Sequence, residues 1–232
     1  MSTNDLALAQ GLRDTRDTLA TWNRAPWPVL RSWLVWSTLV AVGLLLAVYV
    51  VARLSPPDPS TVVLPGINES ATMASVGQVV FRNSLVLALH AMACVAGFIA
   101  GSALPTTASG YTGIWRRVHD LAGPLAIGFV VCATTFSLAT QAYILGGQSS
   151  TIAAQLDIDP ALLLLSLTPH ALPELIALFL PLAAWMIASR LGDWHELLAA
   201  TVVTVAIAAP VVVVSAFVEV YASPRLLLAL LG

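Results

Sequence analysis

The chain has 232 residues, of which 58% are hydrophobic and only 9% are charged, whereas roughly a quarter of the residues in a soluble globular domain are charged. This composition excludes an ordinary soluble protein and predicts that most of the chain lies in a lipid bilayer. The formal net charge of -2 provides neither a basic surface for nucleic acid nor an acidic tail for a basic partner.

Residues 1–27 form a polar N-terminal segment in which charged side chains alternate with leucines and Trp22. This pattern is compatible with an amphipathic helix at the membrane surface and equally with a frayed polar tail. We expect a cytoplasmic or interfacial segment over residues 1–27 and a transmembrane domain over residues 28–232. The first apolar segment is not followed by a signal-peptide cleavage pattern, so we expect the first span to remain in the mature protein.

Five apolar segments are each long enough for the roughly 20 residues that a membrane-spanning helix requires. Between the first two segments, a connection rich in Pro, Gly, Ser and Asn shows no helix or strand pattern. The sequence therefore predicts an all-α, polytopic transmembrane helix bundle of about five spans. The predicted spans are residues 29–54, 79–104, 121–146, 160–189 and 197–220.

The distribution of arginines predicts the orientation of these spans. All ten cationic residues are arginine, and the excess of Ala, Leu and Val suggests a bacterial genome of high GC content. Most of the arginines fall on the N-terminal side of the predicted membrane, which places the N-terminus inside and the C-terminus outside. We therefore expect a multi-pass protein of the bacterial cytoplasmic membrane.

The fourth segment contains Pro169, Pro173 and Pro181. Each proline removes a backbone donor and crowds the carbonyl four residues earlier, so we expect a break near the first two prolines. A bilayer tolerates such a break only where protein or a water-filled cavity covers the backbone. His170 and Glu174 would then lie in the first turn of a new helix, whose positive dipole end favours an anion.

Two carboxylates, Glu174 and Glu219, lie inside apolar segments, where an ionised group is costly unless it is paired or solvated. His170 precedes Glu174 by one helical turn and shares its face. Asn83 opens the second span at a similar predicted depth. We therefore predict an intramembrane polar cluster of Asn83, His170, Glu174 and Glu219, with His90 as a secondary candidate because it lies seven residues after Asn83.

Each of these groups also has a structural interpretation. His90, and the pair of His170 and Glu174, are compatible with buried hydrogen-bonding groups that fix helix packing. Glu219 could simply reach water, and Arg82 is typical of an interfacial side chain whose charged end extends to the membrane surface.

No catalytic or cofactor-binding motif accompanies the polar cluster. One His and two Glu do not make the two-His signature of a zinc protease, so we expect no metal and no other cofactor. The chain shows no phosphate-binding loop, hydrolase elbow or basic stripe. We therefore do not expect an enzyme.

Four short stretches follow one another within about residues 75–225, namely Phe81-Arg-Asn83, Pro169-His170-Ala-Leu-Pro-Glu174-Leu, Pro210 and Ala216-Phe-Val-Glu219. Their order resembles the stage II sporulation protein M family of bacterial integral membrane proteins. Ala171 follows the His where that family typically has Gly. The resemblance implies a multi-span bundle with the polar cluster named above. Sporulation members act in a membrane complex that holds peptidoglycan hydrolases, and relatives also occur in bacteria that never form spores.

Two functions are compatible with the sequence. The first is a non-enzymatic scaffold or subunit of a cell-envelope membrane complex, with other membrane or envelope proteins as partners. The alternative is a transporter or ion-coupled permease that uses an intramembrane His/Glu site beside the broken segment. Five spans without a visible repeat would need a second half, which a homodimer could supply. An intramembrane hydrolase ranks third, because no nucleophile is identifiable beside His170 and Glu174.

Overall fold

The computed structural model describes residues 7–103 and 112–231. The described backbone is largely helical, and five helices are long and apolar enough to cross a membrane. The predicted all-α bundle of five spans is therefore confirmed, and the chain has the helices of a multi-pass membrane protein. The candidate spans are Pro26–Leu54, Met73–Ser102, Ile127–Gln155, Pro160–Leu191 and Trp194–Leu230.

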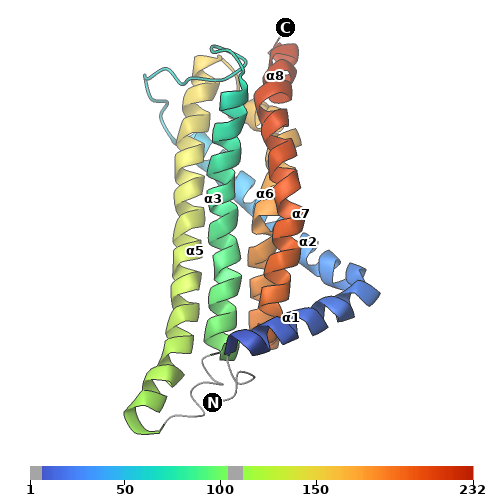
Figure 1. Cartoon of the computed structure of the whole chain (residues 1–232). Helices are drawn as coiled ribbons and strands as arrows, with labels where there is room; N and C mark the ends of the chain where they lie inside the picture. The colour runs from blue at the N-terminus through green and yellow to red at the C-terminus, as the bar shows by residue number, and fades with distance from the viewer. Residues whose placement is uncertain (1–6, 104–111, 232) are drawn as a thin grey trace. The chain divides into compact units, whose positions relative to one another are not determined.

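Figure 1 labels the α-helices, which are joined along the chain by connections and short helical turns. Two short turns, η2 and η4, are π-helical, which means that their backbone hydrogen bonds span five residues. The elements are α1 (Ala7–Arg24), α2 (Pro26–Leu54), α3 (Met73–Phe98), η2 (Ile99–Ala103), α5 (Gly113–Gln155), α6 (Pro160–Leu191), η3 (Trp194–Glu196), α7 (Leu197–Phe217), η4 (Val218–Ala222) and α8 (Ser223–Leu231).

Tertiary contacts divide the chain into two compact units. Each of the helices α2, α3, α5, α6 and α7 has part of its length in each unit. Unit 1 consists of Met1–Ser37, Leu87–Thr134 and Phe179–Ile207, and unit 2 consists of Thr38–Val86, Thr135–Leu178 and Ala208–Gly232.

In unit 1 the N-terminal segment forms the helix α1, which packs on other helices of the unit. Trp22 of α1 meets Trp33 of α2 edge to face, with ring centroids 5.2 Å apart, a favourable geometry for aromatic pairs. Trp33 belongs to the buried core together with Leu180. A Cβ at Gly11 would lie 2.7 Å from the ring of Phe98, so the absence of a side chain at Gly11 allows α1 to approach α3.

In unit 2 the connection over residues 55–72 lies along the C-terminal end of α5. The backbone N–H of Val62 donates to Gln155 Oε1 at 2.9 Å, and Gln155 Nε2 donates to the Val62 carbonyl at 3.2 Å. The Ser150 hydroxyl donates to the Ser55 carbonyl at 2.7 Å. Side chains of α5 therefore satisfy backbone groups of a connection that has little regular structure of its own.

The fourth segment corrects one expectation. In place of a half-helix, a turn and a second helix, α6 is one α-helix over Pro160–Leu191, and its backbone stays helical through Pro169 and Pro173. His170 and Glu174 consequently lie in the interior of α6, and the positive end of a helix dipole does not explain how Glu174 is accommodated.

A membrane helix can continue through proline where neighbouring helices or side chains cover the freed backbone groups. Proline has a helical φ and removes only one backbone bond. In the turn before Pro169, the hydroxyls of Ser166 and Thr168 donate to the carbonyls of Leu163 and Leu164, at 2.7 and 2.8 Å. Those two carbonyls keep their own backbone donors four residues later. The carbonyls that lose a donor to Pro169 and Pro173 are those of Leu165 and Pro169, so the two hydroxyls do not replace the lost bonds.

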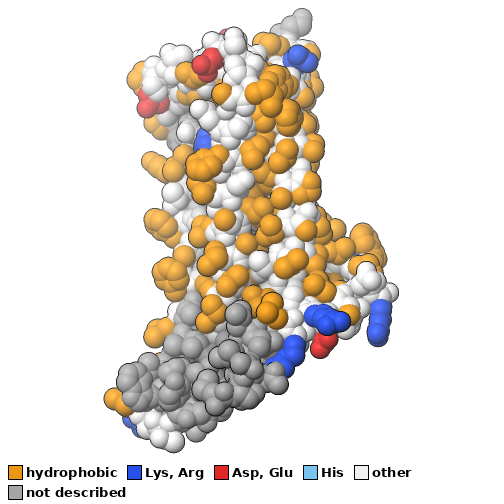
Figure 2. Space-filling model, viewed as in Figure 1, with side chains coloured by type: hydrophobic (Ala, Val, Ile, Leu, Met, Phe, Trp, Pro, Cys, Tyr) orange, Lys and Arg blue, Asp and Glu red, His pale blue; other side chains and the backbone are white. Residues whose placement is uncertain are grey.

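Large apolar side chains cover much of the exposed surface of the long helices. In the face shown in Figure 2, few charged side chains interrupt this apolar surface. Phe129 and Phe136 of α5 are 72% and 74% exposed, and Phe81 of α3 is 65% exposed. A soluble protein rarely exposes so extensive an apolar surface, whereas lipid is the medium that such a surface fits.

Candidate functional site

Unit 2 contains a cavity of about 360 Å³ whose wall is apolar for the most part. A mostly apolar wall with a few polar groups, at this size, is typical of small-molecule sites. The polar side chains that line the cavity are Arg82, Asn83, Gln141, Gln148, Ser149, His170, Glu174, Glu219 and Ser223.

Glu174 of α6 is the buried carboxylate of this cavity, with a side chain only 9% exposed. Asn83 of α3 donates its Nδ2–H to Glu174 Oε1 at 2.6 Å. The other oxygen, Oε2, is one of two buried side-chain polar atoms without a hydrogen-bond partner among the described residues. Leaving a buried acceptor unpaired costs about 1–3 kcal/mol, and more when it is charged. One oxygen of the Glu174 carboxylate is therefore hydrogen-bonded, and the other has no partner among the described residues.

Glu219 approaches the same cavity from η4, the π-helical turn that joins α7 to α8. Its charge repels that of Glu174, and Arg82 attracts it. Arg82 is exposed and also lines the cavity. π-helical turns occur frequently at functional sites, and this one carries the second carboxylate.

His170 is tied to the first residue of α8. A hydrogen bond of 2.6 Å joins His170 Nδ1 and Ser223 Oγ, and both side chains are buried. The sequence analysis missed Ser223. Its only signal is its position four residues after Glu219, because serine hydroxyls in membrane helices usually bond to the backbone.

The structure brings four of the five predicted site residues to one cavity: Asn83, His170, Glu174 and Glu219 all line it. His90 does not line it. That side chain belongs to unit 1, where it is buried with its ring centroid 5.4 Å from that of Phe179. Among the described residues, no group of three or more His, Cys, Asp and Glu is placed to hold a metal ion.

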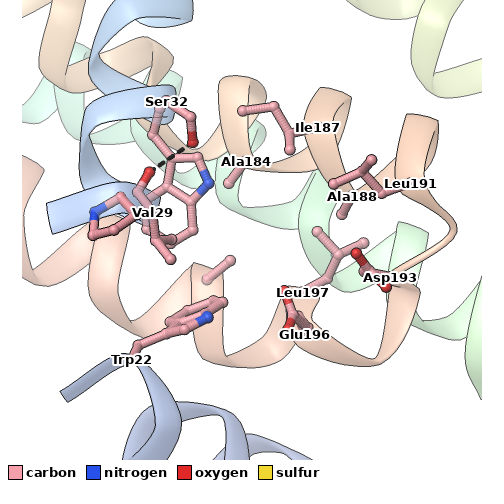
Figure 3. A pocket seen from close by; sticks show the side chains of 13 residues that line it. Trp22, Val29, Ser32, Ala184, Ile187, Ala188, Leu191, Asp193, Glu196 and Leu197 are labelled. Atoms are coloured by element: carbon pink, nitrogen blue, oxygen red, sulfur yellow. Dashed lines mark hydrogen bonds between the residues drawn. The ribbon is translucent and has the colours of Figure 1, made fainter. Parts of the chain in front are cut away.

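A smaller cavity of about 230 Å³ lies in unit 1, and Figure 3 shows its lining. Trp22 of α1 and Val29 of α2 contribute to its wall, as do Asp193 and Glu196 next to the start of α7. The two carboxylates repel each other. Neither carries a buried atom without a partner among the described residues, so the unit 2 cavity is the stronger candidate site.

Carboxylate, amide and hydroxyl groups that converge on an apolar cavity can bind a polar ligand. Glu174 Oε2 can accept a hydrogen bond, and amide and hydroxyl groups such as those of Gln141 and Ser149 can both donate and accept.

Comparison of the chain with models of protein families, with curated proteins and with solved structures finds no match.

Proposed function

We propose that this protein binds a small solute or ion in the unit 2 cavity and moves it across the bilayer, as a transporter or ion-coupled permease. The observation that carries the proposal is Glu174 Oε2, which is buried beside a cavity of about 360 Å³ without a hydrogen-bond partner. Ionisable groups inside membrane segments are rare and usually mark ion or substrate pathways. A ligand with a donor group would remove the cost of the unpaired oxygen.

The course of the last span also supports this function. Helix α7 passes into α8 through the π-helical turn η4, which carries Glu219. Transporters commonly bind substrates and coupling ions where membrane helices depart from regular α-helical geometry. The irregular turn and the unpaired carboxylate belong to the same cavity.

The location that we propose is the bacterial cytoplasmic membrane, with the N-terminus inside and the C-terminus outside. This orientation puts seven of the ten arginines in segments on the cytoplasmic side, namely Arg13, Arg16, Arg24, Arg31, Arg116, Arg117 and Arg190, as the positive-inside rule requires. A homodimer would supply a second half for a transport pathway.

The test is transport by the purified full chain in liposomes. Charge movement and uptake would be recorded for a panel of amines, amino acids, monocarboxylates, sugars and Na⁺. We expect a saturable signal for one class of solute that is lost in Glu174→Gln and retained in Ser84→Ala, a substitution at an exposed position of α3. Folded protein that moves none of these solutes would contradict the proposal.

A scaffold or subunit of a cell-envelope membrane complex is the second candidate. Two hydrogen bonds favour it. The bond between Asn83 and Glu174 links α3 to α6, and the bond between His170 and Ser223 links α6 to α8. The polar groups therefore also fix helix packing. The resemblance to the stage II sporulation protein M family favours it as well, with membrane or envelope proteins as partners.

Extraction from crosslinked native membranes tests the scaffold function. We expect a defined set of stoichiometric partners with the wild type, and loss of that set in Glu174→Gln and Glu219→Gln. A protein that copurifies with no stoichiometric partner would contradict this candidate.

A further inference from the structure

We propose that the ligand of the unit 2 cavity is a small organic ammonium ion with one positive charge, which donates its N–H groups to Glu174 Oε2 and to the carboxylate of Glu219. This inference rests on the proposed function, since it names the class of solute for the same cavity. It is carried by the charges, the hydrogen-bonding groups and the apolar wall of that cavity.

When both carboxylates are ionised, the formal charges that line the cavity leave an excess of one negative charge. Its formally charged lining residues are Arg82, Glu174 and Glu219, so a single positive charge completes the balance. Unit 2 as a whole has three arginines and six acidic residues, a formal net charge of -3. A field of this sign attracts cations and repels anions, which disfavours a carboxylate or phosphate as the ligand.

The unpaired oxygen requires a donor as well as a charge. Asn83 already donates to Glu174 Oε1, and Oε2 of an ionised carboxylate can only accept. An ammonium group supplies up to three N–H donors on one charge. A divalent metal such as Ca²⁺ takes six to eight oxygen ligands, and the described residues include no metal-holding group of three or more His, Cys, Asp or Glu.

The remaining wall indicates that the ammonium group carries an alkyl chain. Leu44, Val48, Leu145 and Leu163 are among the apolar side chains that line the cavity. At about 30 Å³ per water molecule, a cavity of about 360 Å³ has far more room than a bare ammonium ion needs. Each methylene buried on this wall should tighten binding about fourfold.

Direct binding to the purified full chain tests the ligand class. The probe is radiolabelled butylammonium, and the competitors are methylammonium, tetramethylammonium, butanol, butyrate and Na⁺. We expect saturable binding of the probe and competition by methylammonium that is roughly 60-fold weaker, because three methylenes are missing. We expect no competition from tetramethylammonium, which has the charge but no N–H, or from the other three.

Variants locate the binding site within the cavity. Glu174→Gln should weaken butylammonium binding at least tenfold, Glu174→Asp should retain part of it because the charge remains, and Ser84→Ala should bind like wild type. Thermal unfolding of each variant shows whether it is folded. Wild-type affinity in folded Glu174→Gln would overturn the inference, as would competition by tetramethylammonium or Na⁺ equal to that of methylammonium.

The outcomes separate this inference from the proposed function. Transport of an anion or a neutral solute, without binding of butylammonium, would overturn the ammonium ligand and leave the permease function standing. Binding of butylammonium without transport of any solute would support the ligand class and contradict the permease function.

Discussion

The bond between Asn83 and Glu174 decides which way the buried carboxylate points. It joins Asn83 Nδ2 to Glu174 Oε1 over 2.6 Å, a short distance for an amide donor, and hydrogen bonds to an ionised acceptor are roughly twice as strong as neutral ones. Because Oε1 is bonded to Asn83 of α3, Oε2 is the oxygen that remains available to a ligand of the cavity. Asn83 is therefore a positioning residue for Glu174 in both proposed functions.

Asn83→Ala should destabilise the protein by about 1–3 kcal/mol, because it leaves the second oxygen of a buried carboxylate without a donor. The free energy of unfolding would be measured by titration with SDS in mixed micelles, followed by circular dichroism. Ser84→Ala, at the next and exposed position of α3, should change it by less than about 0.5 kcal/mol. Equal stability of the two variants would show that the bond between Asn83 and Glu174 does not contribute to the free energy of unfolding.

Ser223→Ala should cost about 0.5–1.5 kcal/mol, because it removes the hydroxyl that bonds His170. A double-mutant cycle with His170→Ala, measured in the same SDS titration, isolates the energy of the pair. We expect the double variant to lose less than the sum of the single losses. Additive losses would mean that the two side chains contribute independently.

How much of the site the sequence predicts depends on the contrast between each residue and its surroundings. Glu174 and Glu219 stand out because carboxylates are rare in apolar segments. Ser223 does not stand out, since hydroxyls are common there. His90 and His170 look alike in sequence, and only the tertiary fold, which assigns them to different units, separates a cavity residue from a core residue.

At the scale of elements, Gly146 of α5 is where two helices of unit 2 approach closely. A Cβ at Gly146 would lie 2.5 Å from Val51 Cβ and 3.0 Å from the Val48 carbonyl oxygen, both on α2. Val51 Cβ is fixed by the backbone, so the contact can be relieved only by a shift of one helix. A Cβ at the neighbouring Gly147 would meet nothing within 4 Å, which makes this pair of glycines a matched comparison.

Gly146→Ala should therefore destabilise the protein by about 1–3 kcal/mol through overpacking. Gly147→Ala should stabilise it by about 0.5–1 kcal/mol, because alanine loses less conformational freedom than glycine in a helix. Unfolding by SDS measures both variants against wild type. Equal effects of the two substitutions would contradict the close approach of α2 and α5.

Apolar length is a property of the sequence itself, which is why the five spans are predictable. The course of α6 is not predictable in the same way, because whether a proline breaks a membrane helix depends on the tertiary surroundings of the freed backbone groups. The π-helical turn at Glu219 has no residue pattern that predicts it from the sequence.

At the scale of the whole molecule, the arginines are divided unequally between the two units. Unit 1 has seven arginines and six acidic residues, whereas unit 2 has three and six. The ammonium proposal needs the more negative surroundings that unit 2 provides. The orientation proposal needs the arginine-rich segments to lie in the cytoplasm, and it can be tested independently of any ligand.

Labelling of single cysteines in intact cells tests the orientation. Thr61→Cys lies in the exposed connection after α2, and Thr112→Cys lies at an exposed position before α5. Each would be made in a Cys132→Ala background, because Cys132 is exposed and Cys94 is buried. A membrane-impermeant maleimide should label Thr61→Cys in intact cells and Thr112→Cys only after lysis, because the positive-inside rule puts the first outside and the second inside.

The labelling result also bears on how the cavity of unit 2 is loaded. The connection that contains Thr61 supplies Leu64, Pro65 and Ile67 to the cavity wall. Labelling from outside would therefore put this part of the wall at the external surface, as entry of an ammonium ion from outside the cell would require. The reverse pattern would contradict the proposed orientation and make the cavity accessible from the cytoplasm, as export of an amine would require.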